Sequence, residues 1–436
     1  MRRSTPNPTG TDDVSASEDS DWDPDEKPIL PYRRGFSFTA LQHGPPGPFG
    51  VGYCTEKPPQ LTGWDKLSQV AYCLSRPPLE GRTDSTTRRS LTITSTIRTG
   101  QHSGAQIVVV DGNMVAKIYD PLYYPALNEC GYPEDVVVDA DGDYCREAAA
   151  YAQLQKSPDV AAIVPHFYGA WTMDVETPVK QPLHKRVKHV RAVRFILMER
   201  IIGDCMVHID AYDLREHVRS EILKQALAAE ALLFAAGVDH QDICPRNIIV
   251  VGSDYDDPDI PIHGMKVSVK IIDFNIAGVI TYPPYSRRTY LGSSISRRDG
   301  WPNKLPSPIY FRYGHMIDFS AKGWCSNDDD EPEKWLWEHF RNDDCYIPVV
   351  WSPQHPFIPP EYQKPPSKQH DLLTNLTAET FAYSGSDTSS GSQSGSESSN
   401  ESTEEKREKT GEDLTFVKVF REEEELKAAS GATDIA

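Results

Sequence analysis

The chain has 436 residues, enough for one large domain or two ordinary ones, and only 38% of them are hydrophobic. Its formal net charge is −19, of which residues 1–30 carry −5 and residues 371–436 carry −9, so the centre is only mildly acidic. A fold with this charge balance is not expected to bind nucleic acid or an anionic membrane surface, because both require a positive surface.

Targeting and redox signals are sparse. No apolar run approaches the ~18 residues of a membrane span, and the start, "MRRSTPNPTGTDD", lacks the apolar core of a signal peptide. The eight cysteines are scattered without a C-x-x-C pair, which indicates neither a zinc site nor a disulfide framework. We therefore expect an intracellular protein, in the cytoplasm or nucleus, with no membrane partner.

Composition predicts four parts. Residues 1–30 are expected to be a disordered acidic N-terminus, because they hold too little apolar material to offset chain entropy. Residues 31–88 form a Pro- and Gly-rich extension with one short helix at 64–76. Residues 366–436 form a disordered Ser- and Glu-rich tail that is available to bind partners. This leaves residues 89–365 as the folded domain.

Within that domain the periodicity predicts strands first. Three runs rich in β-branched residues, at 91–100, 105–112 and 114–121, are separated by turn residues. This pattern indicates an antiparallel sheet. Apolar residues at three- and four-residue intervals make 214–236 the clearest helix, and Gly237 ends it. Other expected elements are a helix at 142–156, strands at 166–174 and 190–202, a strand within 266–278 and a helix at 333–340.

Five polar residues fall where phosphoryl transfer from ATP needs them. The reaction requires a cation on the phosphates, oxygen ligands for magnesium and a group that orients the acceptor hydroxyl. Lys117 lies on the third strand and Glu147 in the next helix. Asp242 and Asn247 follow the long helix in "HQDICPRN", and Asp273 opens "DFN" after a strand.

The order V-A-x-K, helix Glu, "LMER", H-x-D-x-x-x-x-N and D-F-x resembles the eukaryotic protein kinase superfamily, and "VAKIYDP" and "REAAAY" are similar to kinase-like proteins of fungi. The resemblance covers roughly residues 90–280. It implies an α+β bilobal fold, with an antiparallel N-lobe sheet at about 89–202 and a helical C-lobe at about 203–365. Because little sequence follows the motifs before the acidic tail, we expect the C-lobe to be abbreviated.

The resemblance also implies roles. Lys117 would hold the ATP phosphates and Glu147 would orient it, while Asp242 would accept or orient the proton of the substrate hydroxyl. Asn247 and Asp273 would ligate Mg²⁺.

Three further positions follow from the same resemblance. The backbone at Glu199 and Ile201, just past Met198, would bind the adenine edge. Arg246 would steer the transferred phosphate in place of the usual loop Lys, whose position is taken by Cys244.

The chain departs from the family pattern at the phosphate lid and at the catalytic loop. Gly100 and Gly104 are the only glycines between the first two predicted strands, so the full G-x-G-x-x-G lid is missing. Gln241 replaces the Arg that in the family reads a phosphorylated activation loop, which makes such control doubtful here.

Three functions remain open. The leading one is an ATP-dependent protein kinase. A small-molecule kinase of the aminoglycoside or choline type shares H-x-D-x-x-x-x-N and the following Asp, and the sparse glycines favour it. A nucleotide-binding pseudokinase scaffold is the third, favoured by the eroded lid.

Overall fold

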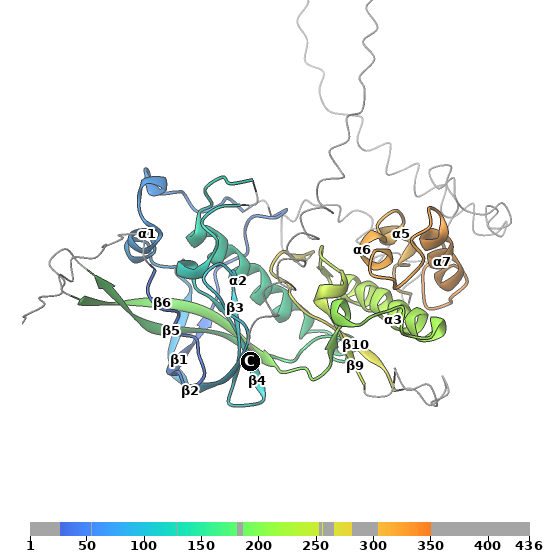
Figure 1. Cartoon of the computed structure of the whole chain (residues 1–436), viewed down its shortest axis with the longest axis horizontal. Helices are drawn as coiled ribbons and strands as arrows, with labels where there is room; N and C mark the ends of the chain where they lie inside the picture. The colour runs from blue at the N-terminus through green and yellow to red at the C-terminus, as the bar shows by residue number, and fades with distance from the viewer. Residues whose placement is uncertain are drawn as a thin grey trace, which may run out of the picture. The chain divides into compact units, whose positions relative to one another are not determined.

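Six antiparallel strands close into a barrel in the order β1-β2-β3-β4-β6-β5 (Figure 1). The computed structural model describes residues 27–53, 55–128, 130–180, 186–252, 255, 266–280 and 304–349, all within one compact unit, residues 1–373. The barrel strands are β1 (Ser37–Gly44), β2 (Arg82–Arg98), β3 (Gln106–Val110), β4 (Met114–Tyr119), β5 (Phe167–Lys180) and β6 (Arg186–Glu199).

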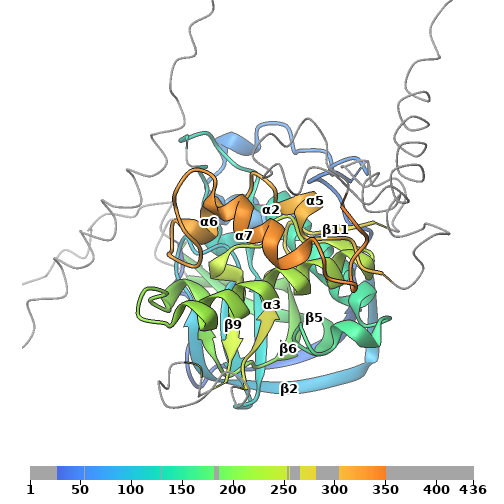
Figure 2. The same cartoon turned by 90° about the vertical axis from the view of Figure 1, so that its right-hand side faces the viewer.

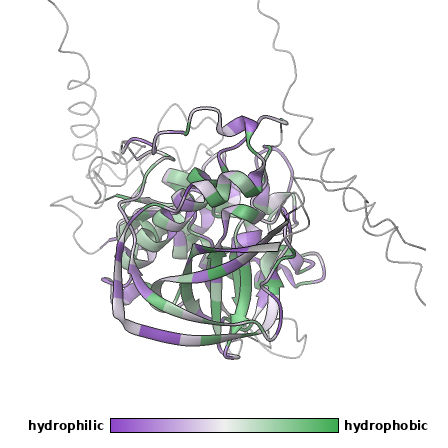
Figure 3. Cartoon of the chain, turned by 90° about the vertical axis from the view of Figure 1, so that its left-hand side faces the viewer, coloured by the Kyte–Doolittle hydropathy of each residue, from purple (hydrophilic) through white to green (hydrophobic). Residues whose placement is uncertain are grey.

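The barrel closes through β1, a strand from the segment that composition set apart as an extension. Its pairing with β5 runs from Ala40 opposite Met173 to Gln42 opposite Trp171, and on its other edge it pairs with β2. Buried and exposed residues alternate along β1, and Figure 3 shows hydrophilic and hydrophobic stretches alternating along the barrel strands. The folded domain therefore includes residues from 37 onward rather than beginning at 89.

The helix expected at 142–156 begins six residues earlier, as α2 (Val136–Leu154). Asp135 caps it by accepting a hydrogen bond from the Val138 amide at 3.2 Å. The three valines that follow the cap are buried, which outweighs the low helix propensity of β-branched residues. The helix expected at 64–76 is divided into a 3₁₀ turn, η1 (Trp64–Lys66), and α1 (Gln69–Ser75).

Beyond the barrel, α3 (Glu216–Ala235) contacts a small sheet and a group of short helices. Figure 2 shows helices α6 (Ile317–Ser320) and α7 (Glu331–Phe340) lying over α3. Trp335 of α7 and Arg312 of α5 bind α3 through Ser220 and Glu230. The elements are the sheet β10-β9-β7 (Ser268–Ile271, Ile248–Val251, Asp204–Cys205), the pair β8 (Val238–Asp239) and β11 (Gly278–Val279), and α5 (Ile309–Arg312), α6 (Ile317–Ser320) and α7 (Glu331–Phe340). Four 3₁₀ turns complete the described elements: η2 (Pro121–Tyr123), η3 (Pro158–Val160), η4 (Met206–His208) and η5 (Pro245–Asn247).

The fold is thus mixed α+β with an antiparallel sheet, as predicted from the sequence. Residues 1–26 of the expected disordered N-terminus and the whole expected tail, 366–436, lie outside the described residues. Within the described ranges, no helix is long and apolar enough to cross a bilayer.

Candidate functional site

Lys117 joins three elements that are far apart in the sequence. Its Nζ donates to Glu147 Oε2 at 2.5 Å and also to Asp273 Oδ1. Lys117 comes from β4, Glu147 from α2 and Asp273 from the loop after β10, so the pairs lie 30 and 156 residues apart. The Glu147 side chain is fully buried, whereas 25% of the Asp273 side chain is exposed. A buried cation thus holds one deeply buried carboxylate and one accessible carboxylate.

Burial and pairing together set the charge states of this triad. Burial alone would lower the pKa of Lys117, but the two carboxylates raise it well above its usual value, so the ammonium stays charged. Burial would raise the pKa of Asp273, yet the Lys117 cation holds it below its ordinary value. Burial raises the pKa of Glu147, and Lys117 opposes that shift. Asp273 is therefore the firmly ionised, accessible carboxylate of the triad.

Two further groups bind Glu147, and sequence reasoning missed both. The Tyr119 hydroxyl donates to Glu147 Oε2 at 2.7 Å, and the Phe274 backbone N–H donates to Oε1 at 3.3 Å. Tyr119 stands two residues after Lys117 on β4, so the two side chains share a strand face. That spacing was the available signal for Tyr119. Phe274 could be placed only by the fold.

The loop between β8 and β9 holds Asp242, Arg246 and Asn247 close together. Arg246 Nη2 donates to both Asp242 carboxylate oxygens, at 2.6 and 2.8 Å, and Asn247 Nδ2 donates to Asp242 Oδ2 at 2.8 Å. The backbone carbonyl of Asn247 accepts the Ile272 N–H at 3.0 Å. This bond places Asn247 beside the segment that carries Asp273, so the two predicted metal ligands come from neighbouring stretches of chain.

His240 ties the same loop to the Asp273 segment as a neutral imidazole. Its Nδ1 accepts the Asp242 N–H at 3.2 Å, so its Nε2 carries the proton and donates to the Ile272 carbonyl at 3.0 Å. Burial lowers the pKa of His240 to about 4, which keeps the ring uncharged near neutral pH. The role of this side chain is therefore to fix two loops.

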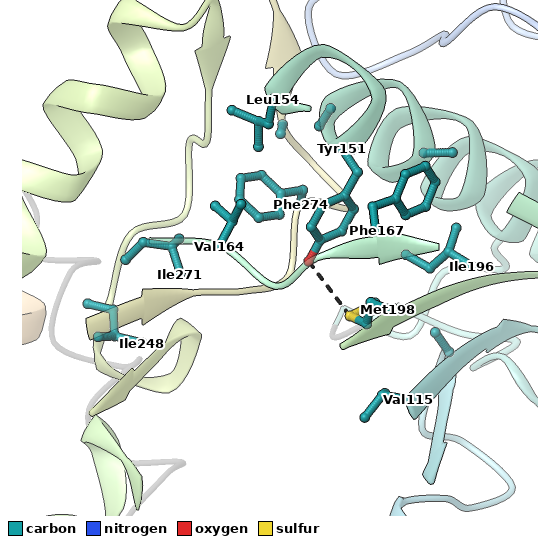
Figure 4. Packing of buried hydrophobic residues seen from close by; sticks show 14 of the residues in the cluster. Val115, Tyr151, Leu154, Val164, Phe167, Ile196, Met198, Ile248, Ile271 and Phe274 are labelled. Carbon is teal, nitrogen blue, oxygen red and sulfur yellow. Dashed lines mark hydrogen bonds between the residues drawn. The ribbon is translucent and has the colours of Figure 1, made fainter. Parts of the chain in front are cut away.

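Phe274, the residue after Asp273, is fully buried and anchors the loop (Figure 4). Its ring lies 4.6 Å from the His240 ring and 5.0 Å from Tyr151 of α2, centroid to centroid. Tyr151 stacks on Phe167 and its hydroxyl contacts Met198 Sδ at 3.7 Å, which connects the loop with strands β5 and β6. A continuous apolar cluster thus supports the position of Asp273.

The loop between β2 and β3, where Gly100 and Gly104 lie, is organised by Gln106. This fully buried side chain accepts the Gly100 N–H at 2.8 Å and donates to the carbonyls of Gly100 and Gly104, both at 3.0 Å. Gly104 has φ +63°, a conformation that favours glycine. Because Gln106 takes the Gly100 N–H, that amide is not available to a phosphate in this conformation.

Glu199 and Ile201 lie at the end of β6. The Glu199 N–H donates to the His166 carbonyl at 2.8 Å, and its carboxylate accepts the His166 N–H at 3.0 Å. The Glu199 amide is thus already paired. Ile201, just past the strand, is half-buried.

The described ranges contain no group of three His, Cys, Asp or Glu side chains that could hold a metal ion. Asn247 and Asp273 nevertheless offer a suitable donor pair, because Mg²⁺ prefers oxygen ligands and typically takes few of them from the protein. Asn247 Nδ2 faces Asp242, which turns its Oδ1 away from that carboxylate. Asp273 engages Lys117 through Oδ1, which leaves its Oδ2 as a donor. Asn247 and Asp273 thus supply oxygen donors of the type that a magnesium ion takes.

No protein-family model matches the chain, and no curated protein matches it at a significant level.

Proposed function

We propose that this protein is an ATP-dependent phosphotransferase of the protein-kinase type, which transfers the γ-phosphate of ATP to a hydroxyl of a protein substrate. In this proposal the barrel and α2 form the smaller lobe, and α3 with the elements after it forms an abbreviated larger lobe. The observation that carries the proposal is the junction at Lys117. A buried cation there meets a helix carboxylate and an accessible carboxylate from distant segments.

The proposed binding mode uses residues of this chain. Lys117, fixed by Glu147, pairs with the phosphates, and the backbone beyond Met198 binds the adenine edge through the Glu199 carbonyl and the Ile201 amide. The Gly100–Gly104 loop covers the phosphates after Gln106 releases the Gly100 amide. Asn247 and Asp273 hold Mg²⁺, which when bound neutralises charge on the phosphates.

The proposed chemistry rests on the β8–β9 loop. Asp242 orients the acceptor hydroxyl and receives its proton as the oxygen attacks the γ-phosphorus, while the bond from that phosphorus to the β–γ bridging oxygen breaks and ADP leaves. In the described conformation Arg246 occupies both carboxylate oxygens of Asp242, and the Arg246 side chain is 61% exposed. Arg246 is therefore free to turn toward the transferred phosphate, and that movement frees Asp242 for the hydroxyl.

Two contacts favour a second candidate, a nucleotide-binding scaffold without turnover. Gln106 occupies the Gly100 amide, and Arg246 occupies Asp242, so two groups required for transfer are engaged elsewhere. A scaffold that keeps the Lys117 junction would still bind nucleotide. The small-molecule kinase also remains a proposal, and it differs only in the acceptor.

The test is thermal unfolding of the full chain with ATP, with and without Mg²⁺. Ligand that binds only the folded state raises the unfolding temperature by mass action. We expect a magnesium-dependent rise that is lost in Asp273→Asn and retained in Asp213→Asn, a matched change at an exposed aspartate. No rise with the unaltered protein at millimolar ATP would refute the proposal. Phosphate transfer to a peptide library, compared with a panel of amino alcohols, then separates protein from small-molecule acceptors.

A further inference from the structure

The loop that carries Asp273 is held in a conformation that it would not adopt on its own. Asp273 has φ +68° and Gln241, on the facing loop, has φ +66°. Residues other than glycine rarely adopt this left-handed backbone conformation, so the surrounding structure must hold both residues in it. The contacts that restrain the loop lie at residues 275–277, directly after Phe274.

Three consecutive carbonyls of this loop each accept a hydrogen bond from a different segment. Arg146 Nε donates to the Asn275 carbonyl at 2.6 Å, and Gln241 Nε2 donates to the Ile276 carbonyl at 3.0 Å. The Tyr53 hydroxyl donates to the Ala277 carbonyl at 3.3 Å. Side chains from the N-terminal segment, from α2 and from the Asp242 loop thus converge on residues 275–277.

The N-terminal segment is joined to this restraint at two points. The Tyr53 hydroxyl also accepts the Val279 N–H at 2.6 Å, so it bridges both ends of the turn into β11. Arg146 Nη1 donates to the Phe49 carbonyl at 2.9 Å, so one guanidinium links residue 49 with residue 275. Phe49, Tyr53 and Arg146 are all buried. We define residues 49–53 together with Arg146 as the brace.

The brace acts on the loop through neutral hydrogen bonds and a guanidinium. The Gln241 side-chain amide binds a backbone carbonyl of the same loop. A buried tyrosine hydroxyl and an arginine fork supply the remaining contacts.

We infer that Tyr53 and Arg146 are positioning residues that fix the Asp273 loop in its site-forming conformation. The inference rests on the proposed function for its consequence in nucleotide binding. Its structural part, that the brace orders residues 273–279, stands separately. The experiment therefore needs one measurement for each part.

The first measurement is amide hydrogen exchange of the full chain without nucleotide. Tyr53→Phe removes the acceptor of the Val279 N–H while keeping the ring. Loss of one buried hydrogen bond is expected to speed exchange at Val279 by at least about fivefold. Tyr132→Phe, at a tyrosine that is 69% exposed, is the matched control and is expected to leave the exchange unchanged. Unchanged exchange at Val279 in Tyr53→Phe would overturn the inference.

The second measurement is the ATP concentration that gives half of the magnesium-dependent thermal shift. We expect Tyr53→Phe and Arg146→Lys, which keeps the charge but loses the fork, to raise that concentration several-fold. A variant that lowers the unfolding temperature without changing this concentration would make the brace merely structural, which also overturns the inference. If the unaltered protein shows no ATP shift, the proposed function fails, and exchange at Val279 alone then decides whether the brace orders the loop.

Discussion

Replacing Lys117 by Met would leave Glu147 buried without its cation, and this change tests the physical account of the site most directly. The Glu147 side chain is fully buried, and its ion pair with Lys117 is 2.5 Å long. Removing one partner of a buried pair typically costs ~3–5 kcal/mol of unfolding free energy, because the remaining charge stays desolvated. Tyr119 and the Phe274 amide still donate to Glu147, so we expect the lower part of that range.

The chain offers a control with similar geometry and different burial. Lys188 and Glu176 form an ion pair of 2.6 Å whose side chains are 70% and 63% exposed. Exposed pairs contribute only ~0–1 kcal/mol, so Lys188→Met is expected to change stability little. Equilibrium denaturation in urea, followed by tryptophan fluorescence, gives both free energies. Equal losses in Lys117→Met and Lys188→Met would refute the reasoning.

The dependence on pH supplies a second check on the same variant. Without Lys117, burial raises the pKa of Glu147 with no cation to oppose it. A carboxyl group whose folded pKa lies above its unfolded value loses stability as the pH rises through the folded value. The deficit of Lys117→Met should therefore grow as the pH is raised, because the carboxyl group of the unfolded chain loses its proton at a lower pH than the buried one. Adding Glu147→Gln should recover part of the loss, and a deficit independent of pH would contradict the account.

Three other predictions concern neighbouring features. Gln106→Leu should lower stability by ~1–3 kcal/mol, because the carbonyls of the lid loop lose their donor; urea denaturation measures the loss. His240, whose pKa burial lowers to about 4, should remain neutral by NMR near pH 6, and its contribution to stability should be lost as the pH falls from its unfolded value of 6.5 toward about 4. Arg312→Met should destabilise the protein by ~3 kcal/mol or more, since it leaves the largely buried Glu230 unpaired; Arg312→Met/Glu230→Gln should lose less, and an equal loss in both would contradict this.

Local patterns in the sequence were sufficient for most of the regular elements. The runs at 105–112 and 114–121 became β3 and β4, and the helix expected at 214–236 became α3 (Glu216–Ala235). Strand alternation and helical spacing are properties of neighbouring residues, so they can be read without the fold. Reliance on neighbouring residues also explains why α2 was predicted to begin at 142 rather than at Val136. The first turn of this helix is apolar and β-branched, and its N-cap is a single Asp.

The polar residues of the candidate site could also be named in advance, because phosphoryl transfer needs such groups and their order along the chain resembles that in protein kinases. Lys117, Glu147 and Asp273 were chosen on that basis, and the structure brings them together. Sequence alone could not tell that Arg246 would pair with Asp242, or that Gln106 would occupy the lid loop. Those pairings depend on side-chain directions that are set by the packing.

The sequence by itself thus determined the types of most elements and the mixed α+β class, and it singled out Lys117, Glu147 and Asp273. Only the tertiary structure decided that residues 37–44 close the barrel and that Tyr53 and Arg146 hold the loop after Asp273. The physical reason is separation along the chain. The contacts of Tyr53 with Ala277 and Val279 span more than two hundred residues, and no periodic pattern of neighbouring residues encodes a hydrogen bond between segments that meet only after folding.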